Sequence, residues 1–267
     1  MLMRFLLNTI AFIILIAAQS PIRSAQVTQC SSQSGDQLAA LLELYTSEGC
    51  SSCPPADRWV NNLKGNGLSS SQVVPLSLHV DYWNYIGWKD PFSKAQYTQR
   101  QRYFGRINRL SSIYTPQMML NGRDFRGWRR GSAKSAIRSI NQHKPKASIT
   151  INTRWASPDN IVISTNALVP LPSDRTNVQL NIAVFENNLR SRVLAGENNG
   201  RRLEHNYVVR KLFTTDMIDN QGQLKHNTSL LIPKDWKRKD LGVAAFVQNI
   251  HNGDVYQAWS VALACDE

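Results

Sequence analysis

The hydrophobic and polar positions divide the chain into a first half that alternates strands with helices and a second half built from strands. Residues 38–46 (LAALLELYT) form a continuous apolar run, the pattern of a strand buried on both faces. The pattern then predicts a helix over 56–63, a strand over 73–83 and a surface helix over 94–110, whose apolar residues recur at helical spacing. Residues 132–143 predict a closing helix.

Turn residues mark the connections between these elements. Asn121-Gly122 lies between two short strand-like segments, which is a strong hairpin signal, and Asn252-Gly253 marks a second hairpin. Ser132 is the expected N-cap of the closing helix. After Lys144-Pro145 the chain predicts an antiparallel β-sandwich of about 120 residues. Its predicted strands cover residues 148–153, 160–165, 178–186, 207–213, 243–249 and 255–261.

The first residues have the layout of a secretory signal. Arg4 precedes an apolar run from Phe5 to Ala18, which is too short for a comfortable membrane span and ends in small and polar residues. We therefore expect residues 1–25 to be a signal peptide and the mature protein to be periplasmic or secreted, with no stable membrane span. An uncleaved N-terminal anchor is the alternative.

The chain is basic, with 31 Lys and Arg residues against 19 Asp and Glu and a net charge of +12. An exported protein rarely meets nucleic acid, and no nucleic-acid-binding motif is present, so we expect no nucleic-acid partner. The charge is scattered over several segments, including Arg123 to Arg130 around the first hairpin. Most of it is expected to be solvated surface, with a general attraction to anionic envelope surfaces.

The motif SEGCSSCPPAD, residues 47–57, contains two of the four cysteines, Cys50 and Cys53. It follows a predicted buried strand and precedes a predicted helix. A cysteine at a helix N-terminus has a lowered pKa, and the thiolate is the species that exchanges disulfides. We therefore expect Cys50 to be the exposed nucleophile and Cys53, one turn further along, to be the resolving thiol.

Four blocks of sequence resemble an exported bacterial thioredoxin-like family known only as a domain of unknown function. The blocks are SEGCSSCPPAD, HVDYWNYIGWKDPF, TPQMMLNG and GENNGRRLEHNYVVR, and they span residues 47–210. The resemblance implies a thioredoxin-like α/β domain over 26–145 followed by the β-sandwich over 146–267. It also implies a cis peptide bond between Thr115 and Pro116, which would shape a substrate groove facing the cysteines.

The motif departs from the commonest thioredoxin pattern. Gly49 stands where an aromatic residue is usual, and both prolines follow Cys53 instead of lying between the cysteines. Because a proline disfavours helical geometry in the residue before it, the helix is expected to begin near Pro55. Its dipole would then stabilise a Cys50 thiolate less.

His79 and Asp81 lie two residues apart on a predicted strand and so share one face. If that face meets the cysteines, Asp81 would accept the proton of Cys53 and His79 would relay it. A hydrogen-bonded core histidine and a turn-capping aspartate are the alternatives. Gly196 to Gly200, in the last block, is expected to be a loop that docks the second half onto the first.

The function predicted from these features is thiol–disulfide oxidoreduction on exported proteins, through Cys50 and Cys53, with an unidentified redox partner and no cofactor or metal. One alternative is a copper chaperone that uses both cysteines and His79. Another is a binding module in which the Cys50–Cys53 bond is only structural. Cys30 and Cys265 remain near the termini, and in an oxidising compartment we expect them to form a structural disulfide.

Overall fold

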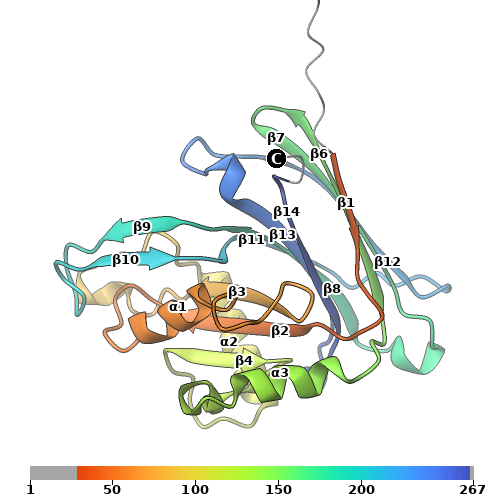
Figure 1. The fold of residues 1–267 in the computed structure, drawn as a ribbon, viewed down its shortest axis with the longest axis horizontal. Coiled ribbons are helices and arrows are strands. Elements are labelled where there is room, and N and C mark those ends of the chain that lie inside the picture. The colour runs from red at the N-terminus through yellow and green to blue at the C-terminus, as the bar shows by residue number, and fades with distance from the viewer. Residues whose placement is uncertain (1–28, 265–267) are drawn as a thin grey trace, which may run out of the picture.

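The computed structural model describes residues 29–264. Its central feature is an eight-stranded mixed sheet, part of which is visible in Figure 1. The order of strands across it is β14-β13-β8-β11-β3-β2-β4-β5. These strands are β2 (Ala40–Thr46), β3 (Val73–His79), β4 (Gln117–Leu120), β5 (Arg123–Asp124), β8 (Val178–Glu186), β11 (Val208–Thr215), β13 (Leu241–Asn249) and β14 (Val255–Ala262).

Strand β2 lies between β3 and β4 in the large sheet and is buried along its whole length. It pairs in parallel with β3 and antiparallel with β4. Helices α1 (Pro54–Asn61) and α3 (Ala133–Asn141) cover one face of these strands, while α2 (Ala95–Ile107) covers the other. Leu42 and Leu44 therefore pack toward α1 and α3, whereas Leu41 and Tyr45 pack toward α2, as strand alternation requires.

The large sheet continues from the first half of the chain into the second. Strand β11 pairs in parallel with β3 at Val208 and Ser77, and the Ser77 amide donates to the Tyr207 carbonyl at 2.8 Å. The same hydrophobic core contains Leu76 of β3 and Phe246 of β13. The boundary predicted after residue 145 thus does not separate two sheets, because both halves share one sheet and one core.

A second sheet packs against the second-half strands of the first. Its order is β1-β6-β7-β12, formed by β1 (Gln29–Gln33), β6 (Ser148–Ser157), β7 (Asn160–Leu168) and β12 (Gln223–Leu231). Ile151 and Ile163 of this sheet share a core with Ile182 and Val243 of the large one. Strand β1 precedes the cysteine motif in sequence but pairs with β6, so residues 29–33 belong to the four-stranded sheet.

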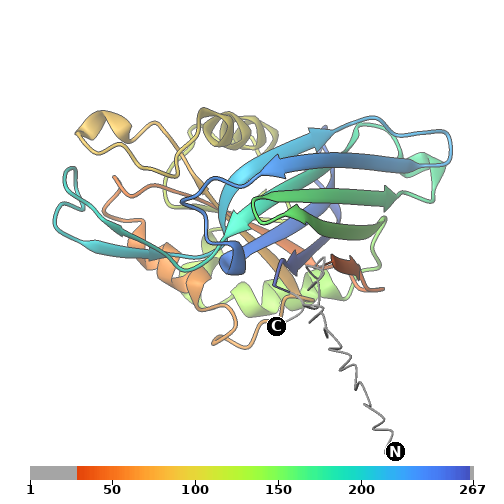
Figure 2. The same cartoon turned by 90° about the horizontal axis from the view of Figure 1, so that it is seen from above.

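A two-stranded hairpin completes the fold. Strands β9 (Leu189–Arg192) and β10 (Arg202–His205) pair only with each other among the described residues. The hairpin extends from the body of the molecule toward α1 (Figures 1 and 2). Asn61 of α1 fixes it there, since its side-chain amide donates to the Glu204 carbonyl and its oxygen accepts from the Asn206 amide.

Most predicted elements are present, with shifted ends. The strand predicted over 73–83 ends at His79, and α1 begins at Pro54, one residue before the Pro55 start that was expected. Ser132 is at the N-cap of α3 as predicted, but its hydroxyl donates to the Gly127 carbonyl and does not cap the helix. Between residues 29 and 264 no helix has the length and apolarity to cross a membrane. The predicted signal peptide lies outside the described residues.

Candidate functional site

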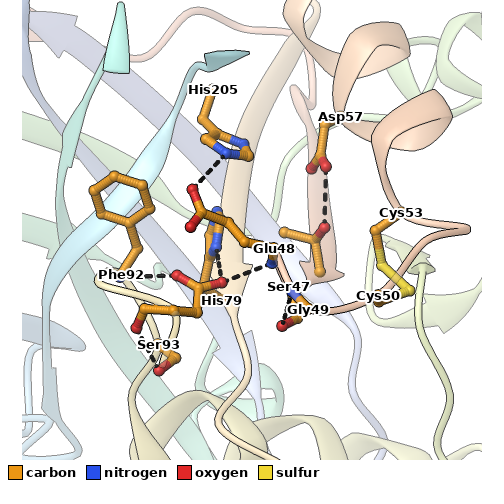
Figure 3. Close-up of polar contacts among 12 residues, drawn as sticks. Ser47, Glu48, Gly49, Cys50, Cys53, Asp57, His79, Phe92, Ser93 and His205 are labelled. Carbon is orange, nitrogen blue, oxygen red and sulfur yellow. Dashed lines mark hydrogen bonds and ion pairs between the residues drawn. A yellow bond between two sulfur atoms is a disulfide. The ribbon is translucent and has the colours of Figure 1, made fainter. Parts of the chain in front are cut away.

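The loop between β2 and α1 carries a disulfide between Cys50 and Cys53 (Figure 3). Both residues are buried, with 1% and 0% of their surface exposed. The prediction of an exposed Cys50 is therefore wrong for the disulfide state, because the surrounding loops cover it. Any partner that attacks Cys50 must first displace a covering group.

Helix α1 offers little of its N-terminal dipole to Cys50. Cys53 is the N-cap residue, and Pro54 and Pro55 have no N–H to donate. The next two amides, of Ala56 and Asp57, both donate to the Cys53 carbonyl, at 2.9 and 3.1 Å. The polar group beside the Cys50 sulfur is instead the Ser52 hydroxyl, whose Oγ lies 3.2 Å from Sγ.

A groove begins at Ser52. The Ser52 hydroxyl also donates to the Thr115 carbonyl at 3.4 Å, and the Thr115–Pro116 bond is cis, which confirms the isomer predicted from the sequence. The groove has a volume of about 430 Å³. It is lined by Ser52, Tyr114, Thr115, Pro116, Arg126, Trp128 and Arg129. The Ser52 hydroxyl thus lies between the Cys50 sulfur and the groove.

Next to the cysteine loop lies a buried network of carboxylates and imidazoles (Figure 3). His79 Nδ1 is 2.7 Å from Asp90 Oδ2, and His205 Nε2 is 3.1 Å from Glu48 Oε1. Asp90 Oδ2 also accepts from the Glu48 amide at 2.8 Å, and the two imidazole rings meet edge to face at 4.9 Å. The network thus connects the end of β2, the end of β3 and the β9–β10 hairpin.

Each imidazole in this network keeps one nitrogen without a hydrogen-bond partner among the described residues: His79 Nε2 and His205 Nδ1. Burial lowers the pKa of His79, but the charge of Asp90 and its hydrogen bond outweigh this, and the pKa is raised above 6.5. For Asp90, burial raises the pKa, yet His79 lowers it below 3.8 overall. Both shifts favour the ionised pair.

Asp57 is a buried acid that follows Cys53 by one helical turn. Its Oδ2 accepts from the Thr46 hydroxyl at 3.2 Å, and the residue is 5% exposed. Burial raises its pKa above 3.8, although His205 and His79 partly oppose the shift. Asp57 therefore holds a proton to a higher pH than an ordinary aspartate.

The GENNG loop, residues 196–200, docks onto the cysteine loop. The Asn198 side chain is fully buried and donates from Nδ2 to the carbonyls of Glu48 and Cys50, at 2.8 and 2.9 Å. Glu197 accepts from the Ser51 amide at 2.8 Å, which lowers the Glu197 pKa. The predicted docking loop thus contacts the Cys50–Cys53 loop itself, and it connects β9 to β10.

Other predicted site residues lie elsewhere. The Asp81 carboxylate accepts from the Thr98 hydroxyl of α2 at 2.6 Å and not from a group at the disulfide. His79 is 0% exposed and bound to Asp90, and in residues 29–264 no group of three or more His, Cys, Asp or Glu residues could hold a metal. The copper set of both cysteines and His79 is therefore not assembled.

The remaining cysteine pair is only partly described. Cys30 is disulfide-bonded, and its Sγ lies 3.8 Å from the Ala262 carbonyl on β14. Cys265 lies outside the described residues, so the Cys30–Cys265 pairing stays a prediction.

Several residues of the site were not predicted from the sequence. They are Glu48, Asp57, Asp90 and Asn198, together with the pairing role of His205. All five lie inside the four sequence blocks that carry the family resemblance, and Asp57 follows Cys53 at the four-residue spacing that places two side chains on one helix face. That spacing is the signal from which Asp57 could have been found.

Two solved structures share the fold. A protein from Agrobacterium tumefaciens is 23% identical, with a TM-score of 0.61, covering 88% of this chain and 98% of its own. HBP35 of Porphyromonas gingivalis is 16% identical, with a TM-score of 0.66, covering 88% of this chain and 78% of its own. No curated protein sequence matches the chain. The model of the family described as "Protein of unknown function (DUF1223)" matches residues 41–248, and the chain belongs to that family.

Proposed function

We propose that this protein is a thiol–disulfide oxidoreductase with a thioredoxin-like first half. The observation that carries the proposal is the Cys50–Cys53 disulfide at a strand-to-helix junction, joined through Ser52 to the groove at Pro116. The order β3-β2-β4-β5, with helices on both faces, supports the thioredoxin-like assignment. The buried Asp57 beside the motif supports a working couple over a mere staple, because a staple needs no proton source.

The exchange would take place in two steps. A substrate thiolate reaches Cys50 from the groove and attacks its sulfur; the Cys50–Cys53 bond breaks, and Cys53 leaves as a thiolate. Asp57 holds a proton that neutralises this buried charge. A second substrate thiolate then attacks the substrate sulfur of the mixed disulfide and releases Cys50. Two electrons pass from the substrate dithiol to the protein, and the reverse sequence reduces a substrate disulfide.

The proposed substrates are exported proteins. This part of the proposal rests on the signal-like residues 1–25 and on the disulfides at Cys30 and Cys50, since disulfides persist in oxidising compartments. A second thiol–disulfide protein would restore the starting redox state after each turnover.

The test is the reduction potential of the couple. The mature protein is equilibrated in dithiol/disulfide buffers, and the Cys50–Cys53 state is read by alkylation and mass spectrometry. Working dithiol couples have potentials of about −270 to −120 mV, whereas structural disulfides lie below about −300 mV. We expect a value in the first range, and loss of the couple in Cys53→Ser. A potential below about −300 mV would overturn the proposal and favour a structural bond.

A further inference from the structure

One wall of the groove is positively charged. It is formed by the 3₁₀ turn Arg126–Arg130, whose arginines at 126 and 129 line the groove. Arg126 and Arg129 are exposed, and no acidic residue is among the lining residues. Arg126 forms an ion pair with Asp124, but no ion pair within residues 29–264 includes Arg129. The wall therefore has a surplus of positive charge.

Aromatic rings hold both arginines in place. The Arg129 guanidinium lies 4.9 Å from the centre of the Trp128 ring, and the Arg126 guanidinium lies 5.2 Å from that of Tyr114. Trp128 is 9% exposed and packs in the core beside α1, so its ring is a fixed platform. A guanidinium that lies against a ring keeps its in-plane N–H donors available for a carboxylate. In Arg126 the Nε–H already donates to Asp124 at 3.0 Å, so its remaining N–H groups and those of Arg129 are the donors for a peptide.

We propose that the groove selects a peptide segment in which aspartate or glutamate flanks the reacting cysteine. The inference rests on the proposed function and adds a substrate class to it. Thiol exchange at Cys50 requires a substrate sulfur at the Ser52 end of the groove. Neighbouring residues of an extended peptide then lie along the groove, where the Thr115 backbone can pair with the peptide main chain and the arginines with its carboxylates. The same positive charge attracts the attacking thiolate.

The test uses three peptides of equal length, each with one cysteine flanked by glutamates, glutamines or lysines. Each peptide is mixed with the wild-type protein, and the extent of reduction of the Cys50–Cys53 disulfide is measured over time by acid quench and mass spectrometry. The rate at which each peptide reduces the protein is divided by the rate at which the same peptide reduces a small symmetric disulfide. This correction is needed because the flanking charges also change the pKa of the peptide thiol. We expect the corrected rates to fall in the order glutamate, glutamine, lysine, and the preference to weaken as salt is added.

Variants locate the preference. Arg129→Gln and Arg126→Gln should each lower the glutamate-to-lysine rate ratio by roughly 2- to 5-fold, the range of exposed ion pairs. Arg154→Gln is the matched control, since Arg154 is exposed on β6 of the four-stranded sheet and does not line the groove. A ratio that is unchanged in both groove variants overturns the inference.

Binding of the same peptides with serine in place of cysteine separates this inference from the proposed function. Titration of the protein with these peptides requires no thiol chemistry. If the glutamate peptide binds more tightly than the lysine peptide and Arg129→Gln removes the difference, the acidic-peptide surface stands even when no peptide reduces the disulfide, and only the oxidoreductase proposal fails. If exchange proceeds at equal corrected rates for all three peptides, the oxidoreductase stands and the charge selectivity is refuted.

Discussion

Replacement of Asn198 by alanine tests whether the GENNG loop stabilises the cysteine loop. The Asn198 amide donates to the carbonyls of Glu48 and Cys50, and the residue is fully buried. Alanine leaves the Glu48 carbonyl without this donor, which costs about 1–3 kcal/mol. The Cys50 carbonyl keeps its bond from the Cys53 amide at 3.2 Å, so its loss is smaller. We expect the free energy of unfolding to fall by about 2–4 kcal/mol in total.

Asn199 provides a matched control, because it is the same residue type in the same loop but is exposed. Asn199→Ala should change stability by less than about 0.5 kcal/mol. For a chain of this size, 2–4 kcal/mol corresponds to a decrease in Tm of roughly 4–16 °C, measurable by calorimetry of the oxidised protein. Asn198→Ala should also speed reduction of the Cys50–Cys53 disulfide by a small dithiol, since the covering loop is released.

Two outcomes would refute this reasoning. Equal stability of the two alanine variants would mean that the loop contributes no buried hydrogen bonds of consequence. A destabilised Asn198→Ala protein with an unchanged reduction rate would mean that the loop is structural and does not control access to the sulfurs.

Two further predictions concern a turn and a buried acid. Gly122 has a φ of +75°, and a Cβ there would lie 1.9 Å from the Gly253 carbonyl oxygen. Gly122→Ala should therefore lower the free energy of unfolding, measured with denaturant, by at least about 2 kcal/mol. Gly35→Ala is the control and should be near neutral, because a Cβ at Gly35 meets open space. Burial holds the pKa of Asp57 above 3.8, so the contribution of Asp57 to stability falls as pH rises from that value through its folded-state pKa. Asp57→Asn does not titrate, and its stability relative to wild type should therefore increase between pH 4 and pH 7; a difference that is constant with pH would contradict the assignment.

The sequence alone was sufficient for the parts of the fold that local patterns control. The continuous apolar run at 38–46 predicted a strand buried on both faces, and β2 lies there between two layers of helices. Asn121-Gly122 predicted a hairpin, and both residues have positive φ between β4 and β5. Such features depend on neighbours within a few residues along the chain, so the local sequence is enough to predict them.

The candidate site was predicted less completely. Cys50, Cys53 and the cis bond before Pro116 were found because spacing and resemblance mark them. Asp90 and Asn198 were not found, since each acquires its role from a partner more than ten residues away: Asp90 from His79, and Asn198 from Cys50. The proton-relay role predicted for Asp81 is not supported by its contacts. Strand β3 ends at His79, and the Asp81 carboxylate accepts a hydrogen bond from the Thr98 hydroxyl.

Tertiary structure decided how the halves combine. By itself the sequence determined that strands and helices alternate before residue 145, that strands follow, and that a cysteine pair lies at a strand-to-helix junction. It did not determine that β11 would extend the sheet at β3, that β1 would join β6, or that the loop between β9 and β10 would hydrogen-bond to the Cys50 carbonyl. The physical reason is that periodicity fixes which face of a strand is buried, whereas the choice of neighbour depends on the burial and hydrogen bonding of the whole assembly.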